Sequence, residues 1–121
     1  MKIRISALDA LFSRYIRTRA GWRCEVCGKS YLPPTQGLHC AHIFSRGKKS
    51  IRFDPDNAIA LCFSCHRWAD QHQTEKEKSH WDRIGTRRFN ALLLRGNTPR
   101  KPDQALIRLW LRQELQQMEA P

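Results

Sequence analysis

The chain has 121 residues and a formal net charge of +11, with 22 Lys and Arg against 11 Asp and Glu. This length fits one domain with a modest core, and no apolar run approaches the roughly 18 residues that a membrane span needs. The excess of positive charge favours a polyanionic partner, and DNA is the natural candidate. We expect no membrane partner, because the aromatic residues are needed for the core.

The five cysteines could form disulfide bonds or bind a metal, depending on the redox state of the compartment. No basic-then-apolar signal segment precedes them, so the cytoplasm is the expected location. Paired cysteines in such a compartment favour metal binding over disulfide bonds.

The first half of the chain combines one helix with short strands. Residues 6–20 carry apolar side chains at helical spacing, with Ser6 as an N-cap and Gly21 as the stop. A turn at 22–28 and a loop at 31–37 follow. Residues 38–44 and 57–61 have the pattern of two short strands, separated by a basic turn at 45–50 and an Asp-Pro-Asp turn at 54–56.

The second half is predicted to be helical. One helix begins near Phe63 and ends near Gln73, before the charged stretch 74–79, and residues 81–94 form a helix or a broken pair of helices. Residues 103–118 form an amphipathic helix whose apolar stripe is expected to hold Leu106, Leu109, Trp110 and Met118. A surplus of apolar side chains on this last helix would form a homodimer face.

Two C-x-x-C pairs, Cys24 with Cys27 and Cys62 with Cys65, supply the four thiolates that a tetrahedral structural zinc site needs. The long segment between the pairs must then fold as a unit with its ends held together, as a hairpin would be. Four unrelated buried cysteines are the alternative. Cys40 is left over and receives no role.

The motif A-H-I followed by N-A-I-A-L-C-x-x-C-H resembles the pattern of HNH endonucleases built around a zinc ribbon. Within that family, G-L-H-C-A-H-I-F-S-R-G and I-R-F-D-P-D-N are similar to the NinG/Rap-like recombination nucleases of lambdoid phages, and more loosely to phage junction-resolving endonucleases. The resemblance implies an α+β fold over residues 1–121. A helix at 6–20 and helices at 80–118 would flank a zinc ribbon and ββα-metal core at 22–73.

The resemblance also implies roles for three residues. His42 would be the general base that takes a proton from the attacking water, Asn57 would hold the two sides of the site together, and His66 would bind a catalytic Mg²⁺ or Mn²⁺. Taken alone, each residue has a plainer interpretation. His42 could be a structural histidine beside apolar residues, Asn57 a turn residue, and His66 a helix N-terminal histidine.

One position departs from the HNH pattern. Many members carry a second metal ligand immediately before the general base, where this chain has Ala41. His39, on the same strand face by alternation, is the expected substitute, and Asp70, one helical turn after His66, is a further candidate. Arg46, Lys48 and Lys49 in the neighbouring turn are expected to contact the DNA backbone, unless they form only a solvated basic turn.

These inferences predict a metal-dependent DNA endonuclease that hydrolyses phosphodiester bonds, with structural Zn²⁺ and catalytic Mg²⁺ or Mn²⁺. Branched recombination intermediates or nicked DNA of a phage or prophage would be its substrates, inside a bacterial host cell. The alternative is a zinc-ribbon DNA-binding protein without catalysis.

Overall fold

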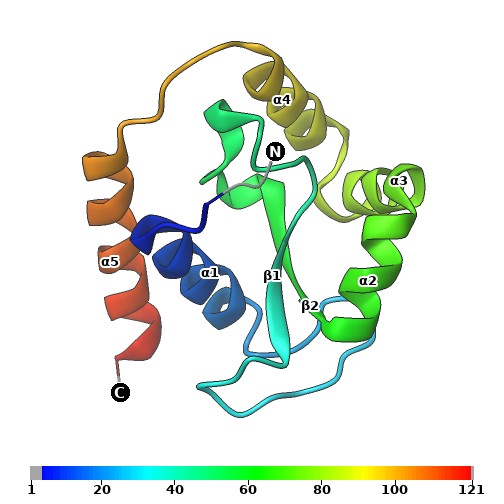
Figure 1. Ribbon diagram of the computed structural model, residues 1–121, viewed down its shortest axis with the longest axis vertical. Helices are drawn as coiled ribbons and strands as arrows, with labels where there is room; N and C mark the ends of the chain where they lie inside the picture. The colour runs from blue at the N-terminus through cyan, green and yellow to red at the C-terminus, as the bar shows by residue number, and fades with distance from the viewer. Residues whose placement is uncertain (1–3, 121) are drawn as a thin grey trace.

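A computed structural model describes residues 4–120, in which five helices surround one β-hairpin (Figure 1). Two single 3₁₀ turns, η1 (Lys49–Ile51) and η2 (Pro55–Asn57), lie in the connection between the strands. The strands and helices are β1 (Leu38–His42), β2 (Ala58–Cys62), α1 (Ala7–Arg19), α2 (Phe63–Gln71), α3 (Gln73–Ile84), α4 (Thr86–Asn97) and α5 (Gln104–Glu119).

The helix α1 begins at a capping box. The Ser6 hydroxyl accepts a hydrogen bond from the Asp9 backbone N–H, and the Asp9 carboxylate accepts one from the Ser6 backbone N–H. Its buried apolar face packs on the hairpin on one side and on α5 on the other. The expected N-cap and helix at 6–20 are therefore confirmed within one residue at each end.

The two strands form an antiparallel pair in which Leu38 lies opposite Cys62 and His42 lies opposite Ala58. Every residue of β2 is buried, as the apolar run 57–61 predicted. The first strand ends at His42 rather than Phe44. Beyond His42, the backbone N–H of Phe44 bonds to the side chain of Asn57 instead of to a partner strand.

The region after α2 differs from the sequence-based prediction. Helix α2 ends at Gln71, close to the predicted end near Gln73, but the charged stretch 74–79 is itself helical and belongs to α3. A second break falls at Gly85, whose φ of +87° suits glycine, so residues 81–94 are the predicted broken pair of helices. One buried side chain of this stretch explains the helix: Lys76 is 8% exposed, and its ammonium reaches the backbone carbonyl of His42 at 3.2 Å. The polar composition of residues 74–79 gave no indication of this tertiary contact.

The apolar stripe of α5 was predicted only in part, because Trp110 packs on α1 but the two predicted leucines are exposed. Leu111 and Leu115 are the buried leucines, whereas Leu106 and Leu109 are 62% and 54% exposed. Helix α5 packs against α1, where the Trp110 ring lies 5.2 Å from that of Tyr15. The i, i+4 pair at 111 and 115 faces this neighbour, and helical periodicity alone does not say which of two adjacent stripes does so.

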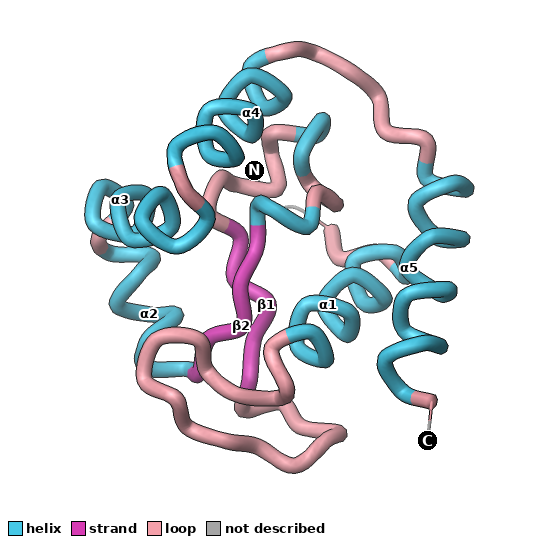
Figure 2. The backbone as a smooth tube through the Cα atoms, turned by 180° about the vertical axis from the view of Figure 1, so that it is seen from behind, coloured by secondary structure: helices cyan, strands magenta, loops and turns pink. Residues whose placement is uncertain are grey.

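The helices cover the hairpin on three sides. In Figures 1 and 2, α1 and α5 lie together on one side of the strands, α2 and α3 lie on the opposite side, and α4 covers the end at which η1 and η2 are found. The fold is therefore α+β, with a hairpin–helix core flanked by N-terminal and C-terminal helices, as predicted. Each of the helices described in residues 4–120 is too short or too polar to cross a membrane.

Candidate active site and zinc centre

The four cysteines of the two C-x-x-C pairs converge on one point. The Sγ atoms of Cys24, Cys27, Cys62 and Cys65 all lie within 4.8 Å of one another. Cys27 and Cys62 are 3.7 Å apart, close to the ~3.8 Å expected between two sulfurs bound to one tetrahedral zinc at ~2.3 Å. The donor set and its spacing fit Zn²⁺, and four thiolates leave no open position on it.

The first cysteine turn is fixed to the hairpin by hydrogen bonds. The backbone N–H of Cys24 donates to Lys29, and Gly28 closes the turn with a φ of +79°. Glu25 then pairs with the outer edge of β2, because its N–H donates to the carbonyl of Ala60 and its carboxylate accepts from the N–H of Ala60 at 2.7 Å. The zinc centre therefore joins the turn at 24–27 to the junction of β2 and α2.

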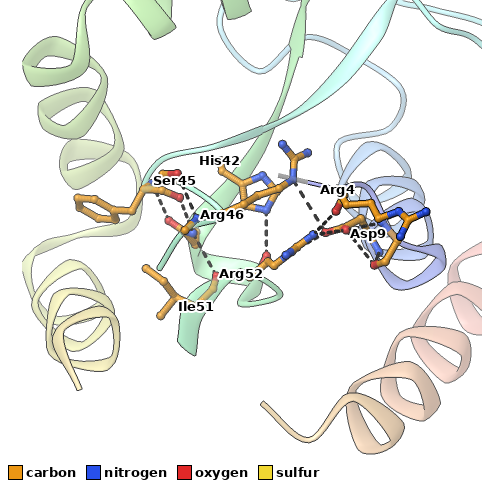
Figure 3. Close-up of polar contacts among 11 residues, drawn as sticks. Arg4, Asp9, His42, Ser45, Arg46, Ile51 and Arg52 are labelled. Carbon is orange, nitrogen blue, oxygen red and sulfur yellow. Dashed lines mark hydrogen bonds and ion pairs between the residues drawn. The ribbon is translucent and has the colours of Figure 1, made fainter. Parts of the chain in front are cut away.

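His42 lies at the end of β1 with one ring nitrogen fixed and the other unpaired. Its Nε2 lies 2.9 Å from the carbonyl oxygen of Arg52, which can only accept, so Nε2 carries the proton in this contact (Figure 3). Its Nδ1 is buried and has no hydrogen-bond partner. Burial lowers the pKa of His42 to about 4, which keeps the ring neutral at pH 7. A neutral imidazole with a free Nδ1 lone pair can accept a proton.

Asn57 is fully buried and holds the connection between the strands. Its Oδ1 accepts from the N–H of Phe44 at 2.9 Å, and its Nδ2 donates to the carbonyls of Phe44 and Ile51, each at 3.1 Å. These contacts are with the backbone two residues after His42 and one residue before Arg52, and not with the imidazole. Asn57 therefore fixes the loop that carries both partners of the Nε2 hydrogen bond.

An ion cluster missed by the sequence analysis surrounds His42. Asp9 of α1 is 5% exposed, and it receives hydrogen bonds from Arg52 and from the Ser6 backbone. Burial alone would raise the pKa of Asp9, but the hydrogen bonds from Arg52 and Ser6 hold it below its ordinary value. The only sequence signal was the capping box, which explains an aspartate at this position but not its burial.

His39 and His66 form a second group. Their Nδ1 atoms are 3.0 Å apart, and the other nitrogen of His66 lies 3.5 Å from the Asp70 carboxylate. Burial holds the pKa of His66 below its ordinary value, which favours the neutral form that binds metals. Phe63 packs edge-on against His39, and a hollow of about 270 Å³ is lined by these residues with Arg67 and Gln71.

The two groups have different neighbours. The ring of His42 lies 5.6 Å from that of Phe12 on α1, whereas His39 contacts the side chains of α2. His39 and His42 are three residues apart on β1, a separation of about 10 Å along the strand. Ala41 is buried and offers no ligand atom, as the departure from the HNH pattern implied. The chain thus places an imidazole base and a histidine pair at different points of one hairpin.

The basic turn beside His42 is joined by residues far away in the sequence. Lys48 and Lys49 are exposed, and with Arg100 and Lys101 they line a hollow of about 590 Å³ between the turn and the α4–α5 connection. Arg46 is half-buried instead and points toward Asp9. We call the four side chains around the hollow, Lys48, Lys49, Arg100 and Lys101, the basic rim. Arg100 and Lys101 had no recognisable motif in the sequence.

The Asp-Pro-Asp turn before Asn57 is held by three arginines from α1 and α4 and by a histidine from α3. Arg19 of α1 donates to the carbonyls of Pro55 and Ala58, and Arg88 and Arg95 of α4 form ion pairs with Asp56 and Asp54. The buried His80 of α3 bonds to the Asp56 carbonyl at 2.5 Å. These contacts are structural, so Arg19 is occupied and is not free for phosphate.

The chain therefore combines a four-cysteine cluster suited to a metal ion with a β-hairpin and a following helix, and it carries His42 on the first strand and His66 on the helix. Residues 24–70 match the family model described as HNH endonuclease. The match contains the four cysteines, His42, Asn57 and His66, and it leaves α1, α3, α4 and α5 outside. No curated protein and no solved structure matches the chain.

Proposed function

We propose that the protein is a metal-dependent DNA endonuclease that hydrolyses phosphodiester bonds, with His42 as its general base. The observation that carries this proposal is the match to the HNH endonuclease model over the segment in which His42 has a fixed Nε2–H and a free Nδ1. A base with a pKa of about 4 is unprotonated at neutral pH and can take the proton of an attacking water. Asn57 supports the same function by fixing the loop around this histidine.

We further propose that His39 and His66 hold the catalytic divalent ion. Two imidazole nitrogens bound at right angles to one ion at about 2.1 Å stand about 3.0 Å apart, which matches the distance between the two Nδ1 atoms. When bound, Mg²⁺ or Mn²⁺ would stabilise the charge on the phosphate and the leaving oxygen. The Asp70 carboxylate lies near Nε2 of His66, whereas Nδ1 of His66 faces His39. Asp70 would therefore orient the His66 ring and would not bind the ion itself.

His39→Ala should raise the Mn²⁺ concentration needed for half-maximal plasmid nicking, by about 10-fold or more if the ion loses one of two imidazole ligands. Calorimetric titration of Mn²⁺ into the zinc-loaded protein should show the same loss of affinity without DNA. Zinc content and the circular dichroism spectrum should not change. His72→Ala, which removes a partly exposed histidine that bonds only to the Trp68 carbonyl, is the control. Mn²⁺ titrations of His39→Ala that overlay the wild type would show that His66 binds the ion without His39.

The positive charge supplies the DNA affinity in this proposal. The basic rim and the net charge of +11 provide cations that can displace counterions from the DNA backbone. Arg46 is closest to His42 and would contact the phosphate beside the base, whereas Lys48 and Lys49 would contact the strand further along. These contacts position the DNA without reading its sequence.

The double variant Arg100→Gln/Lys101→Gln should weaken DNA binding and lower the slope of log K against log salt by about 2. The slope should be measured by fluorescence anisotropy between about 50 and 200 mM salt. Arg112→Gln on the exposed side of α5 is the matched control, because it removes a positive charge outside the basic rim. A slope equal to that of the control would exclude Arg100 and Lys101 from the DNA contact.

The resemblance of the segments around His42 and Asn57 to lambdoid recombination nucleases supports a phage or prophage origin, a bacterial cytoplasm as the location, and branched or nicked DNA as the substrate. The exposed Leu106 and Leu109 on α5 support a homodimer, and sedimentation would measure its mass.

The alternative function, a zinc-ribbon protein that binds DNA without cutting it, draws support from the lack of a described contact between His42 and the His39–His66 pair.

Incubating the zinc-loaded protein with supercoiled plasmid and with a four-way junction tests the proposal. Each substrate should receive Mn²⁺, Mg²⁺ or EDTA, at an EDTA concentration that leaves the zinc content unchanged. Nicking that needs the added ion would support the nuclease, and preferential cutting of the junction would support a role in recombination. Binding to both substrates without cleavage under any of these conditions would favour the non-catalytic binder.

A further inference from the structure

We propose that Asp9 on α1 is a positioning residue for His42: its carboxylate anchors Arg52, whose main-chain carbonyl fixes the imidazole tautomer, and it keeps Arg46 beside the ring. This inference rests on the proposed function for its catalytic consequence. Its structural part, the control of the His42 tautomer by a residue outside the HNH match, can be tested without DNA.

The burial of Asp9 is the first step. A capping-box aspartate needs only to reach the backbone N–H at the start of its helix, and such a position is ordinarily open to solvent. Here the side chain of Asp9 is only 3% exposed. A carboxylate removed from water to this extent is costly unless it is paired and fully hydrogen-bonded. The cap explains only the hydrogen bonds from Ser6 to this carboxylate, so the cost of burial points to a second role.

The second step is the pairing with Arg52. The Nε of Arg52 donates to one Asp9 oxygen at 3.0 Å and its Nη2 donates to the other at 2.5 Å, which is the two-point geometry that fixes a guanidinium in place. The same Nη2 also reaches the backbone carbonyl of Arg4 at 2.8 Å. A side chain held at its far end restrains the backbone from which it grows, and the carbonyl of Arg52 is the acceptor for His42 Nε2–H.

The third step is the position of Arg46. Its Nε lies 3.9 Å from an Asp9 oxygen that Arg52 already uses, and this Nε is buried without a hydrogen-bond partner. Figure 3 shows the Arg46 side chain passing beside the His42 ring toward Asp9. Two guanidinium groups share one carboxylate, so one positive charge is left over beside the His42 ring. Buried polar atoms rarely lack partners, so the unpaired Nε of Arg46 and the unpaired Nδ1 of His42 are both exceptions beside the proposed base.

The test compares Asp9→Asn with Ser6→Ala in the zinc-loaded full chain. Asp9→Asn keeps the size of the side chain but removes the charge that holds both arginines. Ser6→Ala removes the hydroxyl of the same capping box and leaves the Asp9–Arg52 pair intact. Both variants weaken the start of α1, so a difference between them reports on the arginines rather than on the cap.

The first measurement is the ¹⁵N spectrum of the histidine side chains, with His42→Ala used to assign the signal. The wild type and Ser6→Ala should show His42 as the Nε2–H tautomer, and Asp9→Asn should show a mixture with the Nδ1–H form. The second measurement is nicking, where Asp9→Asn should lower kcat by about 10- to 100-fold with little change in KM for DNA. Ser6→Ala should keep the kcat of the wild type.

An Asp9→Asn spectrum identical to that of the wild type, or equal kcat values for Asp9→Asn and Ser6→Ala, would overturn the proposal. Should Asp9→Asn fail to fold, Arg52→Lys tests the same link, because lysine keeps the charge but cannot make the two-point contact. If the wild type cuts no DNA, the proposed function fails while the tautomer measurement still decides the role of Asp9.

Discussion

His42→Ala is expected to lower the rate of plasmid nicking by about 100- to 10,000-fold, the contribution typical of a general base. The imidazole of His42, in the HNH-matched segment, is neutral at pH 7 and has one ring nitrogen without a hydrogen-bond partner. Its removal should leave DNA affinity within about threefold of the wild type, because affinity comes from charged side chains that remain in place. The loss should therefore appear in kcat and not in KM.

Single-turnover nicking and fluorescence anisotropy on the same protein preparations would separate these two effects. His72→Ala is again the control, as a histidine whose described hydrogen bond goes to its own helix. Full nicking activity in His42→Ala would remove this residue from the mechanism.

The pH dependence gives an independent check on His42. Its pKa of about 4 lies below the ordinary value because burial disfavours the charged ring, and Arg46 and Arg52 oppose the charge further while Asp9 favours it. Lys76 of α3, at the His42 carbonyl, adds another positive charge nearby. The base is active when unprotonated, so kcat/KM should rise as the pH increases through about 4 and then become flat. A rise centred near 6.5 would indicate a solvated histidine instead.

The helix at 6–20 and the hairpin could be predicted because local signals and tertiary packing agree there. The Ser6 cap, the apolar face of α1 and the buried run in β2 all require the structure that is found. The end of α2 was predicted within two residues, but the helix over 74–79 was not predicted. Lys76 and His80 are polar residues buried by contacts with the hairpin and its loop, which no local pattern contains. The extent of α5 was predicted correctly, but its buried face was not. The helix that covers this face, α1, lies almost 100 residues earlier in the chain, so no local pattern identifies it.

Some residues of the candidate site could also be predicted from the sequence, and others could not. Spacing alone was enough to predict the four cysteines, since a metal needs ligands at close intervals. The positions of His42, Asn57 and His66 followed from a motif, but their contacts did not. Asp9 is distant from the motif in sequence, and Arg100 and Lys101 lie beyond the last predicted site residue. Residues that act through another side chain or through charge carry no spacing rule, so the structure was needed to find them.

Cys62→Ser is expected to abolish zinc binding and to unfold the protein. Cys62 is the last residue of β2 and the N-cap of α2, and it lies opposite Leu38 at the start of β1, so the zinc centre is attached where the hairpin meets the helix. A structural Cys₄ site contributes on the order of 10 kcal/mol to folding, whereas small domains have only about 5–15 kcal/mol of net stability. Losing one ligand should therefore exceed what the small core supplies.

Elemental analysis should find about one zinc per wild-type chain and almost none in Cys62→Ser, and circular dichroism of the variant should show the loss of helix. Cys40→Ala is the matched control, because Cys40 is also a buried cysteine but burial raises the pKa of its thiol to about 12 and it lies outside the cluster. This control should keep its zinc, since an un-ionised thiol away from the other four is no ligand. A wild-type protein without zinc, in which thiol titration detects disulfides, would contradict the metal assignment. The four converging cysteines would then form two disulfide bonds.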